Sequence, residues 1–139
     1  MKIVSKIAQY LAGVIFLVFG LNGFMHFIPM PPPTGVAGQF MGALYVSHFY
    51  VVIFAAQAIG GALLLANRFV PLALTVLAPV LVNILAFHIT MVPAGLPFAL
   101  FVTVLWFLVF ASVRSAFAPL FQSRWQRVES AAPIVATKP

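Results

Sequence analysis

Four long apolar stretches, separated by short breaks, make up most of the chain. They lie at about residues 7–28, 46–66, 70–91 and 96–113. An α-helix needs about 20 apolar residues to cross a hydrocarbon core of about 30 Å, and each stretch is close to that length. The pattern therefore predicts an all-α fold, a polytopic membrane four-helix bundle formed by residues 1–118.

Asparagine, arginine and proline mark the later breaks. Asn67 and Arg68 follow the second predicted helix, while Pro71 and Pro97 suit the first turns of the third and fourth helices. The short break after Asn67 predicts a tight helical hairpin.

The first break is longer and rich in proline at residues 29–33. Proline lacks the N–H that would continue a helix, so the first helix must end near this run. In residues 36–44, Val36, Phe40 and Leu44 recur at helical spacing. A short interfacial or re-entrant helix is therefore predicted in this first outer loop.

Charged residues are few, and those of the loops lie at the ends of the apolar stretches. Of 139 residues, 64% are hydrophobic and 6% are charged, with Glu129 as the single acid. The basic residues that follow or precede the predicted helices are Lys2, Lys6, Arg68, Arg114, Arg124 and Arg127. Because basic loops mark the cytoplasmic side, both termini are predicted to be cytoplasmic, in the bacterial cytoplasmic (inner) membrane.

Residues 119–139 are predicted to form a cytoplasmic segment outside the bundle. One face of a helix there would carry Leu120, Phe121, Trp125 and Val128. This spacing predicts an amphipathic helix on the inner leaflet, followed by a disordered tail.

Composition excludes several classes of function. A soluble domain typically has about 25% charged residues, and this chain has 6%. Its basic residues are not clustered on one face, so nucleic-acid binding is not predicted. It has no cysteine, which excludes disulfides, thiolate metal sites and covalent haem attachment. No hydrolase, kinase or nucleotide-binding motif occurs.

Four short segments of the predicted helices and loops together match the sequence pattern of a known family. They are Gly20–Phe27 (GLNGFMHF), Gly60–Leu65 (GGALLL), Val82–His88 (VNILAFH) and Pro93–Pro97 (PAGLP). Together they resemble the DoxX-like family of small four-helix membrane proteins, over about residues 4–121. The resemblance implies that fold and a link to quinone chemistry, because the family is named for a small subunit associated with a terminal quinol oxidase and with thiosulfate:quinone oxidation.

The chain departs from that family at two positions within the membrane. Related sequences often carry an acid in the middle of the second helix and another in the fourth, where this chain has Gln57 and Trp106. A carboxylate at that depth can carry a proton, and a glutamine cannot. The resemblance therefore does not imply a proton-coupled mechanism through those two positions in this chain.

Polar residues at membrane depth are the candidates for a ligand site. Those toward the outer leaflet are Asn22, His26, His48, Asn83 and His88. Asn22 and His26 share a helix face, which suits the oxygens of a quinone-like head group. Asn83 and His88 are about 140° apart on an ideal helix, so both serve one site only if the helix is distorted.

Other roles for the polar residues stay open. Histidines at helix ends also bond loops or lipid, and asparagines also join helices, which is the commoner role. Three imidazoles could bind a transition metal, but no acid or cysteine supports them, and no metal site is predicted. Gln57, Gly60 and Gly61 form a small face that predicts close helix packing, with an interhelical hydrogen bond from Gln57.

These patterns favour a non-catalytic accessory or scaffold subunit that binds a partner protein or a lipophilic molecule, or that self-associates. The alternative is a quinone-binding subunit of a membrane oxidoreductase, with quinone as its cofactor. A carrier or channel ranks third, because Thr103 is the one polar side chain near the middle of the fourth helix. The bilayer surrounds the protein in each case, and no catalytic residue is assigned.

Overall fold

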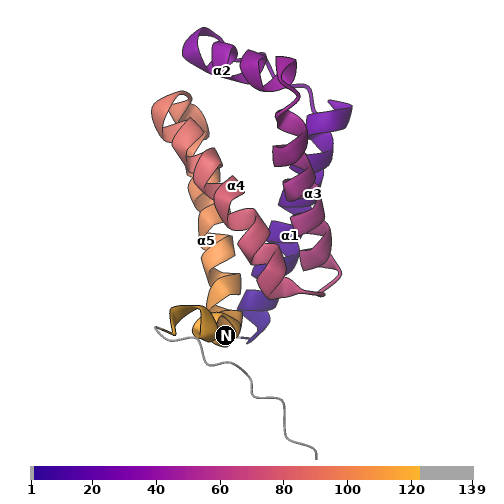
Figure 1. Ribbon diagram of the computed structural model, residues 1–139, viewed down its shortest axis with the longest axis vertical. Coiled ribbons are helices and arrows are strands. Elements are labelled where there is room, and N and C mark those ends of the chain that lie inside the picture. Colours follow the sequence, from indigo (N-terminus) through magenta and orange to yellow (C-terminus); the bar gives the residue numbers. More distant parts are fainter. Residues whose placement is uncertain (1, 123–139) are drawn as a thin grey trace, which may run out of the picture.

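Every regular element in the described part of the chain is a helix. The computed structural model describes residues 2–122. The elements are α1 (Lys2–Met25), α2 (Gly35–Val46), α3 (Tyr50–Leu65), α4 (Val70–Thr90), η1 (Pro93–Gly95), α5 (Leu96–Val113) and η2 (Arg114–Phe121), where η denotes a 3₁₀ helix (Figure 1). The all-α prediction is confirmed for these residues.

Several of these helices are long and apolar enough to cross a membrane. Three candidates qualify alone: α1, α4 and the continuous run of η1, α5 and η2. The 16-residue α3 qualifies only together with α2, from which it is bent by 87°. The chain therefore has three candidate crossings, or four if the bent pair counts as one, in agreement with a multi-pass helical membrane protein.

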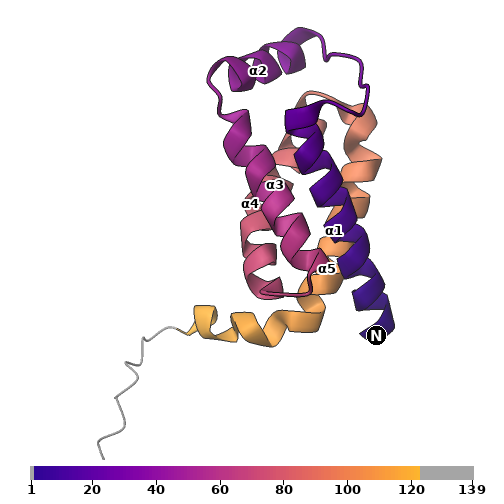
Figure 2. The ribbon, with the colours of Figure 1, turned by 90° about the vertical axis from the view of Figure 1, so that its right-hand side faces the viewer.

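The long helices form a ring in which each packs against two others. Their order around the ring is α1, α3, α4 and α5, and α5 packs back on α1. The N-terminus and η2 lie at one end of this ring, which we call the N-terminal end (Figures 1 and 2). The helix α2 lies across the opposite end, which we call the α2 end, and it has few contacts with the ring.

Two helix boundaries differ from the sequence prediction, and a histidine stands at each. The first helix ends at Met25 rather than at residue 28, because His26 adopts a left-handed backbone conformation with φ of 51°. The second long helix begins at Tyr50 rather than at residue 46, since a turn containing His48, with φ of 59°, separates it from α2.

A third boundary differs as well, and the remaining ones lie close to the predicted ones. The first helix begins at Lys2, five residues before the predicted start, because residues 2–6, three of them polar, continue the helix. The third ends at Thr90 and the fourth covers the predicted 96–113. Of the predicted segment 119–139, residues 123–139 lie outside the described residues, including Arg124, Trp125 and Val128.

Glycines bring α1 and α3 into backbone contact. A Cβ atom at Gly61 would lie 2.4 Å from the backbone N of Leu17, and one at Gly20 would lie 2.5 Å from the backbone N of Ala58. Neither position has room for a larger residue unless the helices separate. Small residues allow this close approach in membrane helices, where it takes the place of the hydrophobic effect as the source of packing energy. Gly60 faces α4 instead, where its Cβ would meet the side chain of Leu77.

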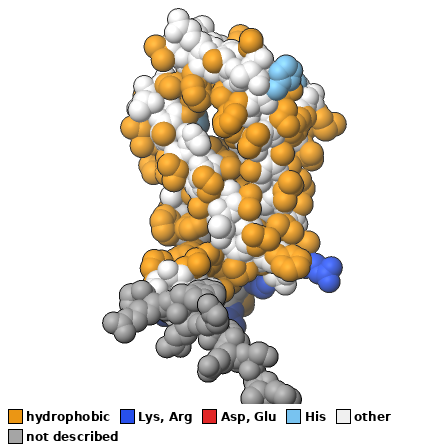
Figure 3. Space-filling view, in the orientation of Figure 1, with side chains coloured by type: hydrophobic (Ala, Val, Ile, Leu, Met, Phe, Trp, Pro, Cys, Tyr) orange, Lys and Arg blue, Asp and Glu red, His pale blue; other side chains and the backbone are white. Residues whose placement is uncertain are grey.

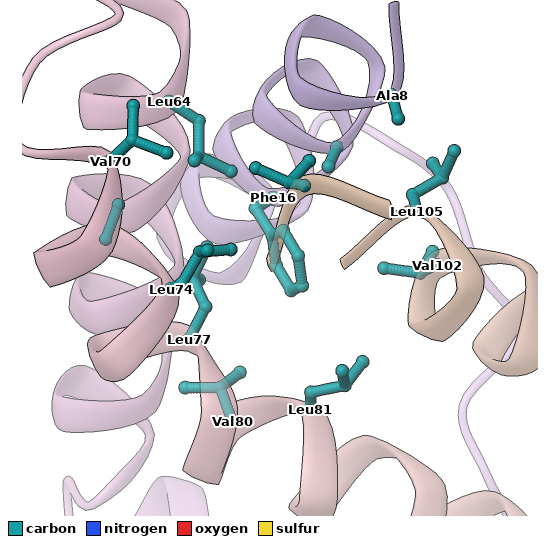
Figure 4. Close-up of a cluster of buried hydrophobic side chains, with 13 residues drawn as sticks. Ala8, Phe16, Leu64, Val70, Leu74, Leu77, Val80, Leu81, Val102 and Leu105 are labelled. Atoms are coloured by element: carbon teal, nitrogen blue, oxygen red, sulfur yellow. The ribbon is translucent and has the colours of Figure 1, made fainter. Parts of the chain in front are cut away.

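The hydrophobic core fills the N-terminal end of the ring. Phe16 of α1 points between the side chains of α4 and those of α5, close to Leu74 and Leu77 (Figure 4). The core continues toward the α2 end as far as Leu81 of α4 and Val102 of α5. Beyond this level α4 and α5 diverge from α1 and α3 (Figure 1).

The outer surface is apolar along the sides and basic at one end. Hydrophobic side chains cover the flanks of the bundle, and Lys and Arg side chains gather at the N-terminal end (Figure 3). Large side chains such as Val52, Ile59, Leu72, Val82 and Phe107 are exposed on the ring. Such a surface is suited to lipid rather than to water.

Candidate ligand-binding site at the α2 end

A cavity of about 510 Å³ lies between the end of α1, the proline-rich loop and α2. We call it the outer cavity. Its walls are mostly apolar side chains and backbone, including Phe19, Met41 and Phe54. Three polar side chains reach it: Asn22, His26 and Tyr45. It therefore has the composition typical of sites for apolar small molecules, a hydrophobic wall with a few polar groups.

Asn22 secures the loop that forms one wall of the outer cavity. Its side chain is buried, and its Oδ1 atom accepts a hydrogen bond of 2.7 Å from the backbone N–H of Ile28. The backbone carbonyl of Asn22 also accepts a bond from the N–H of His26. Asn22 thus helps to end α1 and to turn the chain into the loop, and it is also part of the cavity wall.

His26 and Tyr45 connect the end of α1 to α2. The His26 Nε2 atom lies 3.1 Å from the Tyr45 hydroxyl, and Tyr45 stacks on Tyr50 at the start of α3 with ring centroids 4.6 Å apart. Tyr45 lies outside the long helices of the ring. Burial, and secondarily the neighbouring Tyr50 phenol, raises the pKa of Tyr45, so its hydroxyl stays protonated.

A second cavity of about 160 Å³ lies deeper, among α1, α3, α4 and α5. We call it the inner cavity. Phe19 and Phe54 belong to the walls of both cavities, so these two rings separate them. Gly23 makes the position of Phe54 possible, since a Cβ atom there would lie 2.1 Å from the Phe54 ring. The two polar side chains of the inner cavity are Gln57 and His88.

The five candidates from the sequence do not gather at one place. Asn22 and His26 border the outer cavity, and His88 borders the inner one. His48 is exposed in the turn before α3, and Asn83 is exposed on α4, where its Nδ2 atom donates to the carbonyl of Pro79. A ligand role for Asn22, His26 and His88 stays a prediction, and His48 and Asn83 line neither cavity.

The three α3 residues that the sequence assigned to helix packing, Gln57, Gly60 and Gly61, also have different surroundings. Gly60 and Gly61 lie at close contacts with α4 and α1. Gln57 is 5% exposed, and among the described residues its side chain has no hydrogen-bond partner, so the expected interhelical bond is absent. Instead, its amide contributes to the wall of the inner cavity.

Sequence reasoning missed a polar cluster at the N-terminal end. Gln9 is 4% exposed, and its Nε2 atom donates to the Leu64 carbonyl over 2.8 Å and to Asn67 Oδ1 over 3.1 Å. The Lys6 ammonium donates to the same Asn67 oxygen over 2.6 Å. These bonds hold the α3–α4 hairpin against α1. The signal in the sequence was Gln9, a single amide early in an apolar helix.

Tyr45, Phe19 and Phe54 were missed as well, because aromatic residues are common throughout this chain.

Residues 2–122 contain no group of three His, Cys, Asp or Glu side chains placed to share a metal ion. The site can therefore supply apolar contact, amide and imidazole hydrogen bonds, and a phenol hydroxyl. The chain matches no protein-family model, no curated protein and no solved structure.

Proposed function

We propose that this chain is a multi-pass protein of the bacterial cytoplasmic membrane that binds a lipophilic molecule at its α2 end and acts as a non-catalytic accessory subunit. The outer cavity is the observation that carries the proposal. Its volume of about 510 Å³ and its apolar walls suit a molecule that partitions into the bilayer. The absence of a catalytic role rests on composition, since the chain has one acid and no cysteine.

In this proposal both termini are cytoplasmic, and α2 lies in the outer membrane interface. The support is the distribution of charge. Lys2 and Lys6 lie at the start of α1, Arg68 follows Asn67, which Lys6 bonds, and Arg114 begins η2. By contrast, α2 and its flanking loops carry no Lys or Arg. The positive-inside rule assigns the basic end to the cytoplasm. The outer cavity would then open near the outer leaflet, where a lipophilic molecule can reach it sideways.

A quinone-binding subunit of a membrane oxidoreductase is the second candidate function. The observation that favours it is the approach of Asn22, His26 and Tyr45 to one apolar cavity, because amide, imidazole and phenol groups can all bond the oxygens of a quinone. The resemblance to the DoxX-like family points the same way. A partner protein would provide the redox centre that this proposal requires.

The experiment is to identify the molecules that co-purify with the full chain in a mild detergent, by mass spectrometry. Gly42 lines the outer cavity, and a Cβ atom there would meet nothing within 4 Å. Gly42→Trp should therefore fill the cavity without disturbing the fold. The control is Val36→Trp, because Val36 is 66% exposed on the same helix and is not part of the cavity wall.

We expect wild type and Val36→Trp to retain the same lipophilic molecule, and Gly42→Trp to lose at least about four-fifths of it, as expected when the site is filled. A stoichiometric quinone would select the second candidate function. Equal retention by Gly42→Trp and Val36→Trp, or no retained molecule in wild type, would refute binding in the outer cavity.

A further inference from the structure

We infer that the inner cavity is a site for a single aromatic ring that carries a hydroxyl group, held between Gln57 and His88. This inference rests on the proposed function, because it names the head group of the lipophilic molecule. The apolar remainder of that molecule would lie in the outer cavity. Four observations lead to this chemical class: the volume, the walls, the state of Gln57 and the tautomer of His88.

The volume and the walls fit one ring. The inner cavity measures about 160 Å³, close to the ~150 Å³ of an engineered apolar cavity that binds benzene. Four phenylalanines line it, namely Phe16, Phe19, Phe54 and Phe98. Aromatic walls favour an aromatic guest, because ring edges and faces pair at defined distances.

Gln57 supplies a polar group that lacks a partner. Its side chain is 5% exposed and makes no hydrogen bond to any residue of the described range 2–122. The amide nitrogen and oxygen of Gln57 keep accessible surface, because no fully buried side-chain N or O atom of the described residues lacks a partner. The amide therefore opens onto the cavity and is available to a guest that bonds to it.

His88 supplies an acceptor whose orientation is fixed in advance. Its Nδ1 atom lies 3.0 Å from the Val92 carbonyl oxygen, which can only accept, so Nδ1 carries the proton in the neutral ring. The Nε2 atom is then an acceptor, and it has no partner among the described residues. Gly95 permits this placement, since a Cβ atom there would lie 2.1 Å from His88 Cε1.

These two groups select a guest with a donor. An imidazole acceptor pairs with a hydroxyl and not with a bare carbonyl, whereas the Gln57 amide can donate or accept. A phenol-like ring satisfies both groups, and a hydrocarbon ring satisfies neither. Because Phe19 and Phe54 border both cavities, a ring that enters from the outer cavity passes these two side chains.

The test compares probes that share a pentyl chain and a six-membered ring and differ in the oxygen groups on the ring. Full-length protein in lipid nanodiscs is incubated with 4-pentylphenol, pentylbenzene, 4-pentylanisole or pentyl-1,4-benzoquinone, and the retained probe is measured by mass spectrometry after subtraction of empty nanodiscs. The variants are Gln57→Leu and, in case that variant misfolds, Gln57→Met. The control is Gln39→Leu, the same chemical change at an exposed glutamine of α2 that lines neither cavity.

We expect wild type and Gln39→Leu to retain the phenol about fivefold better than the other three probes, the gain typical of one buried hydrogen bond. Both Gln57 variants should lose that preference. Equal retention of phenol and pentylbenzene by wild type, a higher retention of the quinone, or an unchanged preference in the folded Gln57 variants would overturn the inference. If the inference fails in any of these ways while Gly42→Trp still loses the co-purified molecule, the outer-cavity function stands alone.

Discussion

The two ends of the bundle are built from the same kind of apolar sequence and differ in how closely it packs. At the N-terminal end, buried Leu64, Leu74 and Val109 fill the space between the helices. At the α2 end, the helices diverge around two cavities. The difference shows that hydrophobicity makes these helices candidates for crossing a membrane, whereas the size of individual side chains decides where they touch.

Two buried glutamines express the same contrast. Gln9, at the packed end, donates to both the Leu64 carbonyl and Asn67. Gln57, on the wall of the inner cavity, bonds to none of residues 2–122. The amide of Gln9 is bonded within the protein, whereas the amide of Gln57 stays open to the inner cavity and is available to a ligand.

The largest expected effect comes from breaking the close helix contact. Gly61→Leu would place a side chain where a Cβ atom already lies 2.4 Å from the Leu17 backbone N. We expect a loss of about 3 kcal/mol in the free energy of unfolding, the upper range for overpacking, measured by titration with sodium dodecyl sulfate. Gly42→Leu is the control, because its Cβ meets nothing within 4 Å. Equal unfolding midpoints for the two variants would contradict the backbone contact.

A smaller loss is expected at the satisfied glutamine. Gln9→Leu removes the bonds to the Leu64 carbonyl and to Asn67, so the hairpin between α3 and α4 should loosen. We expect a destabilisation of about 1.5 kcal/mol, as for a buried hydrogen bond with one partner left unpaired. Hydrogen exchange should rise at residues 66–69. No change in either quantity would show that the cluster does not hold the hairpin.

The opposite sign is expected at the other buried glutamine. Gln57→Leu replaces an unpaired amide by an apolar side chain of similar size, so the protein without ligand should become more stable by about 1 kcal/mol. Comparison with Gln9→Leu in the same titration tests the contrast directly, and Gln39→Leu should lie between them. Destabilisation by Gln57→Leu would mean that the amide is paired in solution.

The smallest effect concerns the contact between α1 and α2. Tyr45→Phe removes the hydroxyl that lies 3.1 Å from His26 Nε2 and leaves the stacking on Tyr50 intact. We expect a change below about 0.5 kcal/mol in global stability, as for most exposed contacts. Faster hydrogen exchange confined to α2 should accompany it. Exchange that is unchanged in α2 would show that the aromatic stacking alone holds this helix.

The sequence predicted the helical class because hydrophobic length is a strong signal, and residues 96–113 form α5 as expected. It missed the ends of α1 and α3, because nothing in the composition shows that His26 and His48 take left-handed conformations. These conformations depend on the tertiary structure around the turns. Prediction of these two boundaries therefore failed where the chain changes direction, and the start of α1 was missed because the polar Lys2, Ser5 and Lys6 do not extend the apolar stretch.

The residues of the candidate site were predicted only from their expected depth in the membrane. Depth along a helix identified Asn22, His26 and His88, which do border the cavities, but it also selected Asn83, which is exposed on the ring. Whether a side chain faces a cavity or the outer surface depends on how the four helices pack. A helix that is apolar on all sides carries little information about this packing. For the same reason Gln57 was assigned to helix packing, although it lines the inner cavity.

The short length of α3 has a consequence for the surrounding lipid. Its 16 residues span about 24 Å at 1.5 Å per residue, less than the ~30 Å of an average hydrocarbon core. If α3 crosses the bilayer, the bilayer next to this helix must become thinner to match it. This local thinning has an elastic cost. Hydrophobic mismatch would therefore favour lipids with short acyl chains next to α3. At a boundary between a thinner and a thicker lipid domain, the protein would turn its α3 side toward the thinner one.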